Sequence, residues 1–291
     1  MDLQLKRADL AIATLEDLAT TPSMSPADAL RVRLMLAEAR IAANQTEQAL
    51  HLLDEIAASG AGKSRAYRIA DLRGRAHAAN RSYKKAHDAF TEAAKAAGTP
   101  DESAAAAANR LLCALASGEL PLAREAHEDL RRSAPSDPDL VRWSFLLAAA
   151  EAKQGQIDSL MALAQRSPAV EYAFQAKLAL AEWRLARGEA AAAERILRAA
   201  RDQSDTAERS ASLAAAEIFA ADNAGSLSRE ELLSACTAFL ERHPEAPEAS
   251  DISFKAAELH SRGGDHAAAE SVLSKLARNL KDPETAAIAK F

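Results

Sequence analysis

Residues 67–99 read YRIADLRGRAHAANRSYKKAHDAFTEAAKAAGT and consist of two helix-forming segments on either side of Asn80-Arg81-Ser82. These three residues have the composition of a tight turn. Gly74 before the turn and Ala86 after it are small, which suits positions where two helices approach closely. Phe90 lies four residues after Ala86, on the same face of the second helix. The stretch therefore predicts a helical hairpin.

The small position of the second helix recurs along the whole chain, with intervals that run from 33 to 43 residues by subtraction of residue numbers. A period in this range indicates a stack of repeated helical units. The widest interval contains an insertion at residues 223–228. The recurring residues are Ala11, Ala49, Ala86, Ala123, Leu160, Ala193, Cys236 and Ala269.

Composition favours helix throughout the 291 residues. Hydrophobic residues make up 48 % of the chain, much of it alanine, and aromatic residues only 4 %. Strong helix formers dominate, while the β-branched and aromatic residues that strands prefer are sparse. The predicted fold class is all-α.

The hairpin pattern resembles the tetratricopeptide repeat. That family combines a small residue in helix A, a Gly-Asp-like turn, and a small, large, small series on helix B. Gly263-Gly264-Asp265 and Arg187-Gly188-Glu189 supply such turns. The resemblance implies a right-handed α-solenoid of about seven hairpins after a leading half-repeat, with HEAT-type repeats as the structural alternative. The implied units are 1–22 (half-repeat), 28–62, 65–99, 102–135, 138–168, 171–205, 206–245 and 248–282, with the start of a further helix at 284–291.

Residues 239–277 are similar, more specifically, to tetratricopeptide-repeat proteins of the bacterial cell envelope. His243-Pro244, Ala249 and Gly264-Asp265 carry this likeness. It implies an assembly or secretion context.

Charge and hydropathy exclude several partner classes. The net charge is −6 and no long run of Lys or Arg occurs, so nucleic acid is a poor partner. No apolar run approaches the ~18 residues of a membrane span. The N-terminus lacks the apolar core of a signal peptide. We expect a soluble protein, cytoplasmic by default and periplasmic if an export signal precedes this chain.

Motifs for catalysis or cofactors are weak. Residues 57–64, AASGAGKS, match a relaxed phosphate-binding loop, but no strand pattern precedes them. We interpret them as an inter-repeat turn. The histidines form no metal-binding pair, and Cys113 and Cys236 have the character of small buried hydrophobes. No catalytic, cofactor-binding or metal residues are predicted.

Helix A surfaces line a concave groove in tetratricopeptide arrays, which implies that the matching positions here contact a partner. The arginines among them suit the carboxylates of an acidic segment. The alternative is a solvated charged face without a ligand. Leu112 also falls on this face, and the predicted partner-binding residues are Arg31, Glu38, Arg68, Asp71, Arg75, Arg142, Phe145, Gln175, Glu182, Phe254 and Glu258.

These observations predict a non-enzymatic scaffold that binds a protein or peptide in its groove, with bacterial envelope assembly or secretion as the implied setting. An alternative is the regulatory arm of a larger protein such as a transcription regulator. An enzyme is a remote alternative. Neither end of the chain has the polar cap that a solenoid needs, so we expect the ends to pack on further repeats or on another chain.

Overall fold

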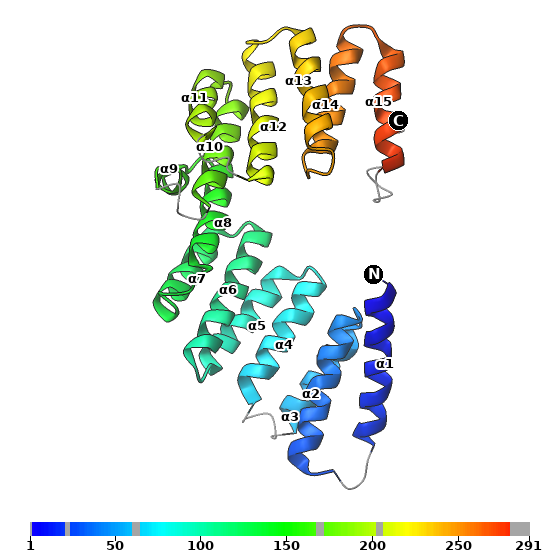
Figure 1. Ribbon diagram of the computed structural model, residues 1–291. Coiled ribbons are helices and arrows are strands. Elements are labelled where there is room, and N and C mark those ends of the chain that lie inside the picture. Colours follow the sequence, from blue (N-terminus) through cyan, green and yellow to red (C-terminus); the bar gives the residue numbers. More distant parts are fainter. Residues whose placement is uncertain (1, 21–23, 60–64, 167–171, 202–205, 280–291) are drawn as a thin grey trace. The chain divides into compact units, whose positions relative to one another are not determined.

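The computed structural model describes residues 2–20, 24–59, 65–166, 172–201 and 206–279. These segments form fifteen α-helices and contain no strand, which confirms the all-α prediction (Figure 1). The helices are α1 (Asp2–Ala19), α2 (Pro26–Ala42), α3 (Thr46–Ala58), α4 (Ala66–Ala79), α5 (Tyr83–Ala96), α6 (Pro100–Ser117), α7 (Leu120–Ser133), α8 (Leu140–Lys153), α9 (Asp158–Ala164), α10 (Ala173–Ala186), α11 (Ala190–Ala200), α12 (Ala207–Ala224), α13 (Arg229–Arg242), α14 (Ala249–Arg262) and α15 (His266–Asn279).

The chain divides into two compact units, unit 1 (Met1–Ala150) and unit 2 (Glu151–Phe291), and the boundary falls inside α8. In unit 1 each helix from α1 to α6 packs on the next one along the chain, and α2 also contacts α4, as α4 contacts α6. Among the described residues, α3, α5 and α7 make no comparable contact with one another. The layer of α2, α4 and α6 is therefore the more closely spaced, inner layer of this unit.

Unit 2 repeats the arrangement of successive helices. Here α9 packs on α10, α10 on α11, α11 on α12, and the chain continues in this way to α15, while α10 also contacts α12. The cores of both units combine contacts within a hairpin with contacts between successive hairpins. One core cluster joins Phe174 and Ala181 of α10 to Ala193 and Leu197 of α11.

The recurring small position is buried in these helices except in α1, as a close helix contact requires. Ala11 of α1 is only half-buried, and Ile12 beside it is buried instead. Ala49, Ala86, Ala123, Leu160, Ala193 and Cys236 are fully inaccessible, and Ala269 is nearly so. The residue four positions later is equally buried in α3, α5 and α11, where it is Leu53, Phe90 and Leu197. In α7 and α13 the buried residue comes three positions later instead. Ala126 and Phe239 are buried there, whereas His127 and Leu240, four positions after Ala123 and Cys236, are half-buried. Positions three and four apart share a helix face, so either can contact the neighbouring helix.

The insertion at residues 223–228 lengthens a helix and adds a structured loop. Helix α12 extends to Ala224 and ends at Gly225, whose φ of 61° is left-handed. Glycine accepts this conformation without strain. Ser228 then begins α13 with a capping box, in which Ser228 and Glu231 each bond the other's backbone N–H.

Two predicted segments fall wholly or partly outside the described residues. The further helix at 284–291 lies outside them, as do residues 60–64 of the phosphate-loop-like stretch. The part of that stretch that is described belongs to the end of α3, with Ser59 as its C-cap. A phosphate cradle instead follows a buried strand. None of the helices in the described segments combines the length and apolar character needed to cross a bilayer.

Candidate functional site

Four of the predicted partner-binding residues meet between α2 and α4, on the inner layer of unit 1. Arg68 and Arg75 of α4 both reach Glu38 of α2, with N–O distances of 2.5 and 2.9 Å. Asp71 lies between the two arginines on α4, 3.4 Å from Arg68 and 4.0 Å from Arg75. The spacing of i, i+3 and i+7 puts these three residues on one helix face.

The two carboxylates of this cluster differ in their electrostatics. Burial by itself would raise the pKa of Glu38, but the hydrogen bonds and charges of Arg75 and Arg68 outweigh it and lower the pKa. Burial also acts on Asp71, whose side chain is only 12 % exposed, and there it prevails over both arginines and raises the pKa.

These contacts change the predicted role of the arginines. With two guanidinium groups and two carboxylates, the cluster carries no net charge when all four groups are ionised. Arg68 and Arg75 therefore bind their own acidic neighbours, and the Asp71 carboxylate is buried among them. The sequence alone suggested arginines open to an acidic partner. It did not reveal that Glu38, one helix away, comes within reach of both.

An equivalent cluster joins α12 to α14 in unit 2. Lys255 and Arg262 of α14 contact Asp222 of α12 at 2.9 and 3.0 Å. Glu258 lies between them on α14, 2.6 Å from Lys255 and also paired with Arg262. The spacing repeats that of Arg68, Asp71 and Arg75.

Of this second cluster, sequence reasoning identified only Glu258. The sequence pattern that marks such a cluster is a basic residue, an acidic residue three positions later and an arginine four positions after that. It occurs in RIADLRGR (68–75) and again in KAAELHSR (255–262).

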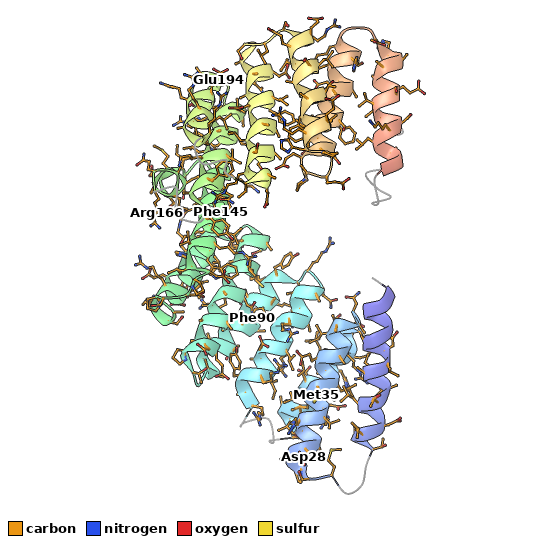
Figure 2. All side chains as sticks on the ribbon, in the orientation of Figure 1. Asp28, Met35, Phe90, Phe145, Arg166 and Glu194 are labelled. Atoms are coloured by element: carbon orange, nitrogen blue, oxygen red, sulfur yellow. The ribbon has the colours of Figure 1, made fainter. Side chains whose placement is uncertain are left out.

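Apolar side chains are exposed on α2 and α6, the two helices that contact α4 in this layer. Leu112 of α6, which the sequence placed on this face, is 42 % exposed. Met35 of α2, which sequence reasoning missed, is 50 % exposed and is labelled in Figure 2. Arg31, Met35 and Glu38 lie at i, i+4 and i+7, so they share a face of α2. Arg31 is exposed and pairs with no other residue in the described segments.

The other predicted residues are not part of either charged cluster. Arg142 of α8 lies over the ring of Trp143, 5.2 Å from its centroid, which is a cation–π geometry. Phe145 on the same helix is half-buried. In unit 2, Gln175 and Glu182 lie on α10 and Phe254 lies on α14. Gln175 and Phe254 are half-buried, whereas Glu182 is exposed.

Groups suited to metal binding or nucleophilic chemistry are not assembled in the part of the chain that the structure describes. No three His, Cys, Asp or Glu side chains there converge on a metal position. Cys113 and Cys236 are both buried free thiols, as predicted, and burial raises the pKa of each to about 11. Thiols with such pKa values are poor nucleophiles at neutral pH.

The residues that resemble envelope proteins occupy helix ends. His243 is the C-cap of α13, and Ala249 is the first residue of α14. Gly264 has a left-handed φ of 78° in the turn after α14, and Asp265 accepts a hydrogen bond from the backbone N–H of Ala268. Each therefore serves helix termination or initiation.

A solved structure with a similar arrangement of helices is a bacterial quorum sensor. The apo form of the quorum sensor NprR from B. thuringiensis superimposes with a TM-score of 0.49 at 12 % identity, over 100 % of this chain and 94 % of that one. No family model matches the sequence, and no curated protein matches it either.

Proposed function

We propose that this chain is a non-enzymatic scaffold that binds a protein or peptide segment on the inner layer of unit 1, formed by α2, α4 and α6. The observation that carries the proposal is the exposure of Met35 and Leu112 on the two helices that flank α4. Large apolar side chains left open beside a polar rim are typical of interaction surfaces.

The charged cluster between these residues influences which partner fits. Its four charges balance, so the cluster by itself does not select for an acidic segment as its two arginines alone would. Side chains of Glu38, Arg68 and Arg75 remain 38–40 % exposed, which leaves hydrogen-bonding capacity toward a partner. We therefore expect a segment with apolar side chains that contact Met35 and Leu112, and polar groups of either charge between them.

The test is a screen of the purified chain against a peptide array, followed by titration of the peptides it captures. The informative variant is Met35→Ser/Leu112→Ser, which removes both exposed apolar contacts. Because both residues are exposed, the variant keeps its helicity and thermal stability. Its captured peptides should bind several-fold more weakly than they bind the unmodified chain.

A matched control is Leu10→Ser/Leu18→Ser, which removes two exposed leucines from α1. It should bind the captured peptides as the unmodified chain does. An equal loss of peptide affinity in both variants would mean that exposed apolar residues bind peptides wherever they lie. The inner layer would then have no special role. Unchanged binding in Met35→Ser/Leu112→Ser would refute the assignment outright.

A further inference from the structure

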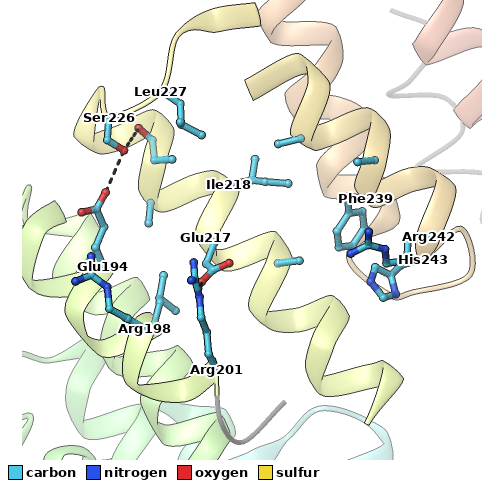
Figure 3. Close-up of a pocket in the computed structure, with 16 residues that line it drawn as sticks. Glu194, Arg198, Arg201, Glu217, Ile218, Ser226, Leu227, Phe239, Arg242 and His243 are labelled. Atoms are coloured by element: carbon cyan, nitrogen blue, oxygen red, sulfur yellow. Dashed lines mark hydrogen bonds and ion pairs between the residues drawn. The ribbon is translucent and has the colours of Figure 1, made fainter. Parts of the chain in front are cut away.

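In unit 2 a pocket opens between α11 and α13, and α12 forms its floor (Figure 3). Its volume is about 480 Å³, within the range of ligand-binding clefts. The insertion identified in the sequence builds one end of it. Ser226 and Leu227 follow the extended α12, and the Ser226 hydroxyl donates a hydrogen bond to Glu194 of α11 at 3.0 Å.

The floor of the pocket is apolar and its volume comes from small side chains. Leu197, Ile218 and Phe239 are almost inaccessible to solvent and contribute its larger apolar surfaces. Alanines occupy the positions around them, including Ala214 on α12 and Ala238 on α13. Because alanine fills little volume, the space between α11 and α13 stays open to an apolar side chain from another molecule.

The rim is cationic. Figure 3 shows Arg198 on one side of the pocket and Arg242 on the other, carried by α11 and α13. Neither pairs with a carboxylate in the described part of the chain. The two acids that line the pocket already have partners: Glu217 binds Arg201 at 2.8 Å and Glu194 accepts from Ser226. Glu194 keeps its charge, because a hydroxyl donor does not neutralise a carboxylate. The three arginines and two glutamates that line the pocket leave it a net charge of +1.

We propose that this pocket binds an acidic peptide segment that carries one large apolar side chain. The apolar side chain occupies the floor among Leu197, Ile218 and Phe239. Carboxylates before and after it in the segment pair with Arg198 and Arg242, for which the guanidinium fork is well suited. Both arginines are exposed, so the pocket admits a segment that continues past it in either direction. The site is separate from the inner layer of unit 1.

The probe is a fluorescein-labelled hexapeptide of sequence Asp-Glu-Ala-Phe-Glu-Asp with blocked ends, titrated with the full chain and followed by fluorescence anisotropy. Two matched peptides separate the contributions: Lys-Lys-Ala-Phe-Lys-Lys inverts the charge, and Asp-Glu-Ala-Ser-Glu-Asp removes the large apolar side chain. The acidic apolar peptide should bind saturably and the tightest of the three. Because the contacts at the rim are exposed ion pairs, its affinity should fall as NaCl rises from 50 to 500 mM.

Variants of the chain locate the binding. Arg198→Gln/Arg242→Gln should weaken the acidic peptide by about 2- to 5-fold for each arginine, the range of exposed ion pairs. Ala238→Phe fills the pocket from an exposed position and should also weaken it. Arg195→Gln is the control, because Arg195 is on α11 but does not line the pocket. It should bind as the unmodified chain does.

The proposal is overturned if none of the peptides binds saturably, or if the inverted-charge peptide binds as tightly as the acidic one. It is also overturned if Arg195→Gln costs as much affinity as the double arginine variant, or if both the double arginine variant and Ala238→Phe leave the affinity unchanged. Met35→Ser/Leu112→Ser gives an independent check of the site. This variant should retain full affinity for the acidic peptide, and a loss there would place the binding on unit 1.

Discussion

Gly74 of α4 lies directly against the ring of Phe90 of α5. A Cβ atom at position 74 would be 2.6 Å from Cε1 of that ring, well inside van der Waals contact. Phe90 is 2 % exposed, so the ring has little freedom to move away. The absence of a side chain at position 74 thus makes room for the aromatic ring at position 90.

Gly74→Ala should therefore destabilise the protein although alanine is the better helix former. Overpacking in a filled core costs about 1–3 kcal/mol, while the gain in helix propensity is about 1 kcal/mol. Urea denaturation followed by circular dichroism measures the difference. Adding Phe90→Leu should relieve the clash, so the double variant should lose less stability than the sum of the single variants. Full additivity would show that the two residues are not in contact.

Ala193→Leu should be destabilising by about 1–3 kcal/mol, because Ala193 is fully buried where α11 packs on α10. Ala191→Leu on the same helix is the matched control. Ala191 is exposed, and the change there should stay within about 0.5 kcal/mol. Similar losses of unfolding free energy at the two positions would contradict the register of α11.

Glu38→Gln should destabilise the protein at pH 7. The pKa of Glu38 lies below its ordinary value of 4.5 in the folded chain, so its ionised form stabilises the fold above that pH. This stabilisation is lost as the pH falls through the lowered pKa. Because the side chain is 39 % exposed, we expect less than about 1 kcal/mol. Parallel denaturation of both proteins from pH 7 to pH 3 should show the difference shrinking at acid pH.

Asp71→Asn, by contrast, should stabilise the protein at pH 7. The folded-state pKa of Asp71 is raised above 3.8, so keeping it ionised at neutral pH opposes folding. The asparagine variant should be the more stable protein at pH 7. Its advantage should disappear as the pH falls through the raised pKa and Asp71 becomes protonated. A variant that is less stable than the unmodified chain at pH 7 would show that the arginines outweigh burial at this position.

Cys113 and Cys236 should react slowly with Ellman's reagent in the native protein. Both are buried and have pKa values of about 11, so about a thousandth of each thiol is ionised at pH 8. Both should react fully in denaturant. Ala191→Cys supplies an exposed thiol as a positive control, and only that thiol should react rapidly in the folded chain. Rapid native reaction of a second thiol would contradict the burial of the pair.

The hairpins could be predicted from the sequence because they depend on residues that are close together in the chain. Ala49, Ala86 and Ala123 mark the face of each helix that is buried, and the spacing between them gives the length of the repeat. Each of these residues is buried as expected. The candidate surface was accessible only in part. Leu112 was placed correctly on an exposed face, whereas the exposure of Met35 went unnoticed because a methionine at helical spacing is as compatible with a core as with a surface.

The sequence by itself determined that this chain is helical, that its helices pair as hairpins and that small residues mark their contacts. These properties follow from helix propensity, from the periodicity of residues three and four apart, and from the regular return of one small position along the chain. Only the tertiary structure decided which charges are satisfied. Glu38 lies 30 residues from Arg68, and Asp222 lies 33 from Lys255. Whether a guanidinium meets a partner carboxylate or one from its own chain depends on how one hairpin stacks on the next, and charge pairing across that distance leaves no periodic signal in the sequence.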